Sequence, residues 1–376
     1  MSRTIICIIN QPTQYDPPLW TALQRRGTLR PIVWYVKMTG FSDPDTGQLL
    51  SWGDDRIRTY EFESVDRKVL AARFAALFDL PVAVLSDGWA HDYTRRLAWA
   101  CLRRGVPMIL PSDRVADPSE PWARRQVRKL VRRITSPVFR GHITPGTLGK
   151  NALLADGIAA NRIETALYPV DVALFQSRLM ELRNLSQQIR NRWPADAKVV
   201  VAVAKHVARE SPMLLIDSFA CLRRQVPKAR FLFVGDGPMR GAIQARIVEL
   251  GLEDDVFLPG YVPYPQLPAY YGAADLFLHV AEFEPWGISV SEAMACGLPV
   301  VATASVGSTV DLVVPGVTGA VADAADPAVL AVKLLEALEL AGSAATRAAV
   351  LRQVDRVDVE QAAARIESLV DRITGH

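Results

Sequence analysis

The chain has 376 residues, of which 50% are hydrophobic and 22% are charged, a balance typical of a packed globular protein and not of a disordered or fibrous one. At ~150 residues per domain, this length predicts two domains. The net charge of only +3 argues against a dedicated nucleic-acid-binding protein. The four cysteines are scattered without a CxxC pair, so they indicate neither a disulfide framework nor a zinc site.

Localisation is predicted from the same features. No stretch approaches the ~20 apolar residues that a membrane-spanning helix needs. The first apolar run, Thr4–Ile9, is too short for the core of a signal peptide. We therefore expect a cytoplasmic protein.

Short apolar runs alternate with longer helical patterns along the chain. In the first half the apolar runs are Thr4–Ile9, Pro31–Val36, Pro81–Leu85 and Pro107–Leu110. In the second half they are Lys198–Val203, Arg230–Val234, Val256–Leu258, Asp275–Val280 and Pro299–Thr303. The helical patterns include Met213–Arg224, Met239–Leu250 and Pro327–Leu340. Near-continuously apolar strands separated by helices predict α/β domains with parallel sheets.

A domain boundary is expected at the polar, Arg- and Gln-rich stretch between the two series of strands. We predict a Rossmann-like domain over residues 1–170, a linker at 171–197 and a second Rossmann-like domain over 198–356. Ligands of open parallel sheets bind at the carboxyl ends of the strands. Two such domains facing each other would therefore place the site in a cleft.

The most informative segment is residues 282–299, with the sequence EFEPWGISVSEAMACGLP, which follows a predicted strand. A tight turn around Gly287 precedes a helical composition over Ile288–Cys296, and Gly297 predicts the end of that helix. A helix that starts at the carboxyl end of a strand offers unpaired amides, which bind phosphate or diphosphate.

Two carboxylates flank these amides. Glu284 lies on the turn, and Glu292 lies about one helical turn inside the helix. Because a carboxylate would be repelled by a bound diphosphate, each is better placed to accept hydrogen bonds from sugar hydroxyls on either side. The alternative is a helix-capping glutamate with a solvated second one.

This segment resembles the E-x7-E signature of glycosyltransferase family 4, retaining enzymes with the two-domain GT-B fold. The similarity extends in the right order over residues 198–340. The other matching stretches are Val234–Pro238, Leu258–Val262, Pro299–Thr303, Val306–Asp311 and Gly316–Gly319. That order and spacing are far more specific than one motif.

The resemblance implies a donor site in the second domain. Glu284 would contact the donor sugar, and Glu292 the ribose of the nucleotide. The residues implied in holding the diphosphate and the base are Trp286, Gly287, Ile288, Gly260, Tyr261 and Val262. The resemblance also places a C-terminal helix, residues 357–376, on the first domain.

The chain departs from the family after the first strand of the donor domain. Family members have Gly-Arg there and a lysine about five residues on, whereas this chain has Ala204-Lys205 and then Arg209. We expect Lys205 and Arg209 to neutralise the departing diphosphate, unless they are solvated surface cations. With these cations, no metal or other cofactor is expected.

Gly235 belongs to a matching turn, which needs glycine mainly for its backbone.

The first domain resembles the family less closely and is expected to bind the acceptor. Candidate contacts in its first loop are Thr13, Gln14 and Tyr15. Family members keep a histidine near the reacting sugar; the candidates here are His91 and, in its place after the strand Pro107–Leu110, Asp113. The resemblance implies that the acceptor attacks on the face that the phosphate leaves, without an enzymic nucleophile.

Residues 121–155 contain eight basic residues and no acidic one. On a helix, Arg124, Arg128 and Arg132 share one face, and apolar residues occupy another side. Such a basic amphipathic helix favours an anionic membrane surface, and a solvated face is the alternative. Nucleic acid is a poorer partner because no aromatic stacking platform accompanies the charges.

Together these features predict a retaining GT-B glycosyltransferase that moves a sugar from a nucleotide-diphosphate sugar to a saccharide, lipid-linked glycan or small metabolite. One alternative is a nucleotide-sugar epimerase or a phosphorylase on a related frame. Another is a non-catalytic, membrane-docking relic of a glycosyltransferase. The paired glutamates favour the transferase.

Overall fold

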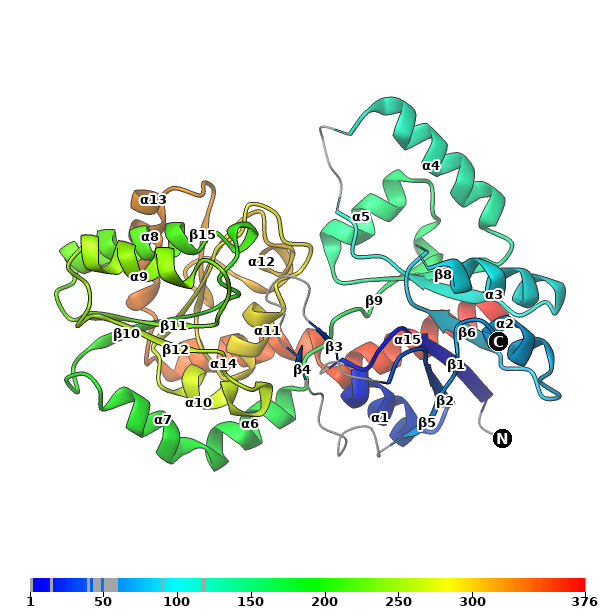
Figure 1. Cartoon of the computed structure of the whole chain (residues 1–376), viewed down its shortest axis with the longest axis horizontal. Helices are drawn as coiled ribbons and strands as arrows, with labels where there is room; N and C mark the ends of the chain where they lie inside the picture. Colours follow the sequence, from blue (N-terminus) through cyan, green and yellow to red (C-terminus); the bar gives the residue numbers. More distant parts are fainter. Residues whose placement is uncertain are drawn as a thin grey trace. The chain divides into compact units, whose positions relative to one another are not determined.

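The computed structural model of the chain describes residues 3–13, 16–38, 41–42, 49–50, 60–89, 91–115 and 120–375. They form two compact units. The first comprises Met1–Ser42, Leu49–Pro169 and Val359–His376, and the second contains Val170–Asp358. Each unit has a parallel sheet covered by helices (Figure 1), so the prediction of two α/β domains is confirmed.

The first unit is built on a seven-stranded parallel sheet with the order β5-β2-β1-β6-β7-β8-β9. Its strands are β1 (Arg3–Ile9), β2 (Leu29–Tyr35), β5 (Glu61–Ser64), β6 (Ala83–Ser86), β7 (Met108–Pro111), β8 (Phe139–Thr144) and β9 (Ile163–Thr165). A separate antiparallel pair joins β3 (Phe41–Ser42) to β4 (Leu49–Leu50). Its helices are α1 (Asp16–Arg26), α2 (Leu70–Ala75), α3 (Asp92–Arg103), α4 (Trp122–Thr135), α5 (Thr147–Ala155) and α15 (Val359–Thr374).

The apolar run of β1 reflects burial on both faces of this sheet. Ile5 and Cys7 belong to one core cluster, to which α1 and α15 contribute. Ile6 and Ile8 belong to the cluster on the other face, with residues of α2 and α3. Successive side chains of a strand point to opposite faces, so a strand buried on both needs apolar residues at every position.

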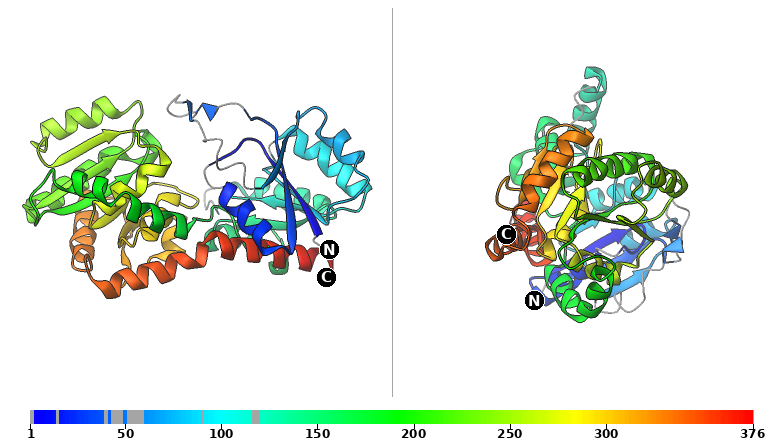
Figure 2. Two further views of the ribbon diagram at one scale, coloured as in Figure 1. Left: turned by 90° about the horizontal axis from the view of Figure 1, so that it is seen from below. Right: turned by 90° about the vertical axis from the view of Figure 1, so that its left-hand side faces the viewer.

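The C-terminal helix α15 completes the first unit. An ion pair joins Arg3 to Asp371, and Nε of Arg26 donates to Oε2 of Glu367 at 2.8 Å. The two ends of the described chain therefore lie side by side (Figure 2).

The second unit is built on a six-stranded parallel sheet with the order β12-β11-β10-β13-β14-β15. Its strands are β10 (Lys198–Val203), β11 (Ala229–Val234), β12 (Val256–Gly260), β13 (Leu276–His279), β14 (Val300–Thr303) and β15 (Gly319–Ala322). Its helices are α6 (Val172–Glu181), α7 (Arg183–Arg190), α8 (Pro212–Gln225), α9 (Arg240–Glu249), α10 (Leu267–Gly272), α11 (Ile288–Ala295), α12 (Gly307–Leu312), α13 (Pro327–Leu338) and α14 (Ala344–Val354).

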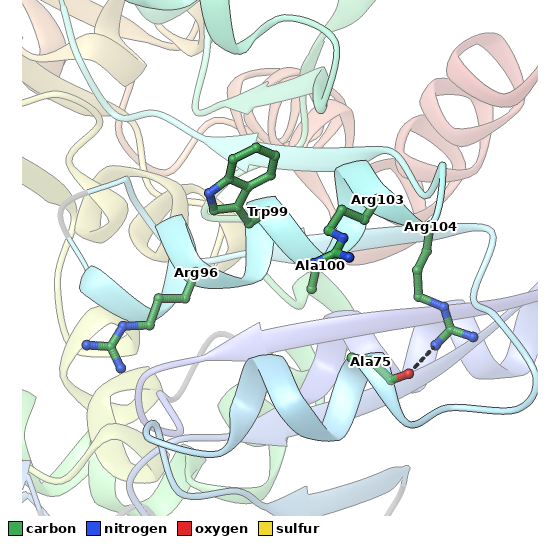
Figure 3. Close-up of a pocket in the computed structure, with 6 residues that line it drawn as sticks. All are labelled: Ala75, Arg96, Trp99, Ala100, Arg103 and Arg104. Atoms are coloured by element: carbon green, nitrogen blue, oxygen red, sulfur yellow. Dashed lines mark hydrogen bonds between the residues drawn. The ribbon is translucent and has the colours of Figure 1, made fainter.

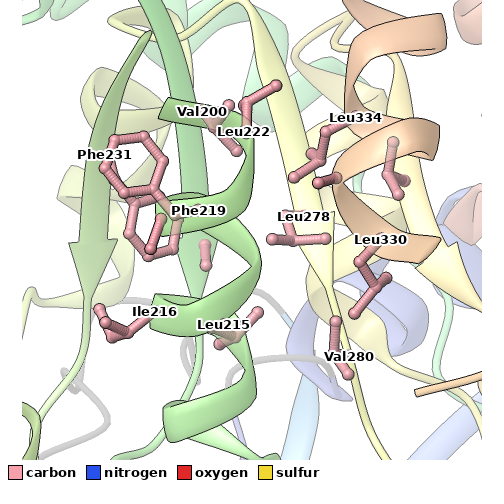
Figure 4. Packing of buried hydrophobic residues seen from close by; sticks show 14 of the residues in the cluster. Val200, Leu215, Ile216, Phe219, Leu222, Phe231, Leu278, Val280, Leu330 and Leu334 are labelled. Carbon is pink, nitrogen blue, oxygen red and sulfur yellow. The ribbon is translucent and has the colours of Figure 1, made fainter. Parts of the chain in front are cut away.

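Helices α8 and α13 pack on one face of this sheet (Figure 4). Phe219 of α8 stacks on Phe231 of β11 with ring centroids 5.1 Å apart, and Leu330 of α13 lies in the same core. The segment 171–197, expected as a linker, instead forms α6 and α7 of the second unit. Arg190 at the end of α7 donates to Oδ2 of Asp275 at 2.8 Å, which ties this segment to the start of β13.

The strand order places the site of the second unit. The chain moves from β10 outward to β12 and then returns to β13 on the other side of β10. Because all pairings are parallel, the loops that follow the strands lie along one edge. The reversal of strand order beside β10 marks the position where open α/β sheets bind ligands.

Candidate active site

Glu284 lies in the loop after β13 and pairs with the loop after β14. Its backbone N–H donates to the carbonyl of Ser305 at 3.3 Å, and its own carbonyl accepts from the N–H of Gly307 at 2.9 Å. Glu284 and Val306 form an isolated parallel bridge. The backbone of this residue is thus fixed from both sides at the carboxyl edge of the sheet.

The carboxylate of Glu284 contacts the start of α11. Its Oε1 accepts from the amide N–H of Trp286 at 3.3 Å and from that of Gly287 at 3.1 Å. These are two of the amides that the family resemblance implies for the diphosphate. The glutamate therefore occupies the place of an anion at the helix start, and a diphosphate on these amides would have to displace it.

Gly287 is required at this turn for two reasons. Its φ is +81°, a left-handed conformation that side chains disfavour. A Cβ atom there would lie 2.7 Å from Cγ1 of Val306 and 3.3 Å from Nε2 of His279. The close approach of the end of β13 and of the loop after β14 thus leaves room only for glycine.

Glu292 lies inside α11 with only 3% of its surface exposed. Its Oε2 accepts a hydrogen bond from the Tyr271 hydroxyl of α10 at 2.9 Å. Burial raises the pKa of the Glu292 carboxyl to about 8, so it carries a proton over much of the neutral range. Its contact with a ribose stays a prediction.

This pKa makes stability depend on pH. The carboxyl of an unfolded chain has a pKa of about 4.3, so between that pH and about 8 the folded protein holds a proton that the unfolded chain has lost. The contribution of Glu292 to the free energy of unfolding should therefore fall from pH 5 to pH 8, so the free energy of unfolding of the wild type should decrease relative to that of Glu292→Gln over this range. Thermal unfolding across this range measures the difference. If the free energies of unfolding of the variant and the wild type change equally with pH, the prediction is wrong. Glu249→Gln removes an exposed carboxylate and is the control.

The two predicted cations lie in the loop after β10. Lys205 and Arg209 both act electrostatically on the partly buried carboxyl of Glu210, whose Oε1 lies 3.7 Å from Nη2 of Arg209. The pKa of the Glu210 carboxyl is raised, mainly by burial and also by the charge of Glu284. The charge of Arg209 offsets part of that rise. The structure thus places both cations and Glu284 within electrostatic range of one carboxylate, Glu210, which the sequence analysis missed.

The turn after β11 packs closely against the loop after β10. A Cβ atom on Gly235, whose φ is +142°, would lie 1.9 Å from the carbonyl oxygen of Ala204. The N–H of Gly235 donates to the carbonyl of Gly260 at 3.0 Å, which brings the end of β12 to the same edge. After Gly260, Tyr261 is exposed and Val262 is buried.

Several buried polar side-chain atoms at this edge lack a partner among the described residues. They are Nδ1 and Nε2 of His206, Nε2 of His279, Nε1 of Trp286 and Oγ1 of Thr309. Burial lowers the pKa of both histidines to about 4, so both are neutral at pH 7. Buried polar groups without partners are uncommon and require an explanation, which a bound polar ligand would supply.

In the first unit, Thr13 contacts the start of α1. Its N–H and its Oγ1 donate to Oδ2 of Asp16 at 3.2 and 2.9 Å. Burial, with a smaller contribution from the nearby charge of Asp87, raises the pKa of Asp16 to about 6. Gln14 and Tyr15 lie outside the described residues.

His91 follows β6 beside Asp87. Its Nε2 lies 3.6 Å from Oδ2 of Asp87, and its ring stacks on Tyr93, which donates to the same oxygen at 2.6 Å. Burial raises the pKa of Asp87. The loops after β1 and β6 therefore combine Thr13 and His91 with two carboxylates that the sequence analysis missed.

Asp113 follows β7, and its Oδ2 accepts from the Tyr168 hydroxyl at 3.5 Å.

Elsewhere in the first unit, a groove of about 690 Å³ lies between α2 and α3 (Figure 3). Its lining residues are Ala75, Arg96, Trp99, Ala100, Arg103 and Arg104. Arg104 donates to the carbonyl of Ala75 at 3.0 Å, so this cation supports the end of α2.

The prediction that Arg124, Arg128 and Arg132 form one exposed basic patch is wrong for two of the three. Nε of Arg128 donates to Oδ2 of Asp156 at 2.9 Å, and Nη2 of Arg132 lies 3.2 Å from the same oxygen. Arg128 also pairs with Glu120 and lowers the pKa of that carboxyl to about 2.

Among the described helices, none is both long and apolar enough to cross a bilayer.

Known proteins resemble this chain in sequence, and the family match lies within the second unit. The profile of the family "Glycosyl transferases group 1" matches residues 186–350. Mannosylfructose-phosphate synthase of Agrobacterium fabrum is 40% identical over 31% of this chain and 28% of its own length. A GDP-mannose-dependent α-(1-6)-phosphatidylinositol monomannoside mannosyltransferase of Mycolicibacterium smegmatis is 36% identical over 35% of this chain and 36% of its own length. The chain thus covers about a third of these relatives.

A longer alignment includes both units. D-inositol 3-phosphate glycosyltransferase of Thermomonospora curvata is 32% identical over 329 residues, which are 78% of this chain and 75% of that protein. The chain therefore belongs to the group 1 glycosyltransferases.

Solved structures agree with this assignment at the level of the fold. A glycosyltransferase of Rickettsia africae has a TM-score of 0.77 at 14% identity and covers 99% of this chain and 98% of its own. Anabaena HepE, solved with UDP and glucose, has a TM-score of 0.69 at 17% identity and covers 97% of this chain and 98% of its own. The fold of the two units is that of the GT-B glycosyltransferases.

Proposed function

We propose that the chain is a retaining, family 4 glycosyltransferase that uses a nucleotide-diphosphate sugar. The observation that carries this proposal is the position of Glu284, whose carboxylate lies on the amides at the start of α11. An incoming diphosphate would take those amides and release the carboxylate toward the hydroxyls of the donor sugar. One movement would thus bind the anion and complete the sugar site.

The transfer step needs charge stabilisation more than a protein nucleophile. The bond between the anomeric carbon and the phosphate oxygen breaks, and the acceptor oxygen forms a bond on the same face. The acceptor proton passes to the departing phosphate oxygen, which leaves a nucleoside diphosphate. Lys205 and Arg209 act on Glu210, as Glu284 does, and would stabilise the charge that develops on this leaving group. We propose that they do so without a metal ion.

We propose that the acceptor is a polyhydroxylated molecule bound by the first unit. Asp16 and Asp87 follow β1 and β6 and would accept hydrogen bonds from hydroxyl groups, with Thr13, His91 and Asp113 as neighbouring contacts. The Thermomonospora relative is named for an inositol phosphate acceptor, and the Mycolicibacterium relative for a phosphatidylinositol mannoside. A lipid acceptor of the second kind would require the protein to associate with a membrane surface, which we also propose.

The test is a panel of UDP-, GDP-, ADP- and dTDP-sugars incubated with the purified protein. We expect one donor both to raise the melting temperature and to be hydrolysed slowly, with equal rates in EDTA and in Mg²⁺. A sugar isomerised without release of nucleotide would favour the epimerase alternative. Silence across the panel would favour the non-catalytic relic.

A further inference from the structure

Helix α4 exposes an apolar face although it belongs to a compact unit. None of its fourteen described residues is buried, and Figure 1 shows it standing outside the layers formed by the sheet and the other helices. Its exposed apolar residues form what we name the outer stripe. They are Trp122 (72% exposed), Val127 (61%), Leu130 (58%), Val131 (39%) and Ile134 (67%).

The opposite face of α4 is bound to the unit by ion pairs. Arg128 and Arg132 both contact Oδ2 of Asp156, whose side chain is only 2% exposed. Arg114 pairs with the same carboxylate at 3.1 Å and with Glu120 at 2.7 Å. These charges fix the rotation of the helix about its axis, so the outer stripe is held toward solvent.

Of the remaining cations, Arg125 donates to the carbonyl of Glu120, and the other three flank the outer stripe. At 100° per residue, Arg124 lies beside one edge of the stripe, and Lys129 and Arg133 lie beside the other. Arg124 and Arg133 are exposed, and no acidic residue occurs between positions 121 and 155. The outward face therefore combines apolar side chains with positive charge only.

We propose that α4 docks in the plane of an anionic lipid bilayer, with the outer stripe in the acyl boundary and Arg124, Lys129 and Arg133 at the headgroups. An apolar face with flanking cations matches such an interface, and Trp122 suits its polar boundary. At about 21 Å, a helix of this length lies on a membrane and does not span it. This inference rests on the membrane association proposed above and names the surface that makes it.

Sedimentation with vesicles of phosphatidylcholine alone, or with about 30% phosphatidylglycerol added, tests the docking surface. The wild type should bind the anionic vesicles and not the neutral ones, and the double variant Val127→Ser/Ile134→Ser should lose roughly tenfold or more of that binding. Trp99→Ser is the matched control, because Trp99 is a 67% exposed tryptophan beside arginines on α3. It should bind as the wild type does.

A second variant guards against an effect of misfolding. Arg124→Gln/Arg133→Gln leaves the outer stripe intact, and its binding to anionic vesicles should be weaker and less dependent on salt. Wild-type protein that binds neither kind of vesicle would overturn the proposal and favour a solvated face. Equal binding by the stripe variant and the wild type would overturn it as well.

Hydrolysis of the nucleotide sugar without vesicles separates this proposal from the transferase itself. The stripe variant should hydrolyse the donor as fast as the wild type, because α4 belongs to a different unit from the donor residues. Vesicle binding without hydrolysis in any preparation would leave the docking surface standing and contradict the transferase.

Discussion

Replacing Glu284 with alanine is expected to lower sugar transfer roughly a thousandfold, while nucleotide affinity changes by no more than a few-fold. The carboxylate is the group that we place on the donor sugar, where its hydrogen bonds would strengthen as the sugar acquires positive charge. Removing it leaves the amides of Trp286 and Gly287 available to the diphosphate. The loss should therefore appear in kcat and not in the affinity for the nucleoside diphosphate.

Two further variants define the cause of that loss. Glu284→Gln keeps an oxygen that accepts from the same amides but removes the charge, so transfer by it should remain low. Glu282→Ala changes an exposed carboxylate two residues upstream in the same loop and should behave as wild type. Steady-state rates measure kcat, and calorimetric titration measures the affinity for the nucleoside diphosphate. Equal transfer rates for Glu284→Ala and Glu282→Ala would show that Glu284 is not part of the active site.

The second large effect is expected from Gly287→Ala, which should lower both stability and transfer. The left-handed backbone at φ +81° costs a side chain about 1–2 kcal/mol. Overpacking against Val306, whose Cγ1 would lie 2.7 Å from the new Cβ, adds about 1–3 kcal/mol. Relief of that contact must move the turn that carries Glu284, so we expect transfer to fall by at least about a hundredfold.

Gly316→Ala separates the two contributions. Gly316 has a similar φ of +74°, but a Cβ atom there has nothing within 4 Å. Gly316→Ala should lower the free energy of unfolding only by the cost of a side chain on a left-handed backbone, and it should leave transfer unchanged. Thermal unfolding and donor hydrolysis of both variants give the comparison. If the two variants lose the same stability and activity, crowding at Gly287 has no role.

The sequence predicts strands best where burial makes them uniformly apolar. The strands β10 and β11 are examples, since almost every residue in them faces a core. In contrast, β8 (Phe139–Thr144) contains Arg140, Gly141 and His142 and has no apolar pattern. His142 is nevertheless buried, and burial with the charges of Arg132 and Arg162 lowers its pKa to about 3. Only the packing of distant segments around the strand makes it part of a sheet.

The same distinction applies to the candidate site. Glu284, Gly287 and Glu292 lie in one short segment, so their spacing alone indicates a strand, a turn and a helix. His206 and Asp87 join the two candidate sites only through loops that follow other strands, and no local pattern distinguishes them from core or surface positions. Buried polar atoms and coupled charges become visible only in three dimensions.

Helix α4 illustrates why a helical wheel is not sufficient. The sequence places Arg124, Arg128 and Arg132 on one face, but whether that face is exposed depends on Asp156, which lies 28 positions beyond Arg128. The buried carboxylate turns two of these arginines inward. The apolar residues, which a wheel would assign to the core, are left outside.

Helix α15 has a consequence for the order in which the protein is assembled during translation. The first unit is interrupted by the second and receives Ile366, Leu369 and Val370 of α15 into its core. A ribosome therefore releases all of β1 to β9 long before the helix that covers one face of their sheet, whereas every strand of the second sheet, β10 to β15, emerges between these two parts of the first unit. The second unit is in a position to fold first, and the nascent first unit must keep an apolar sheet face from aggregating until residues 359–374 have been made.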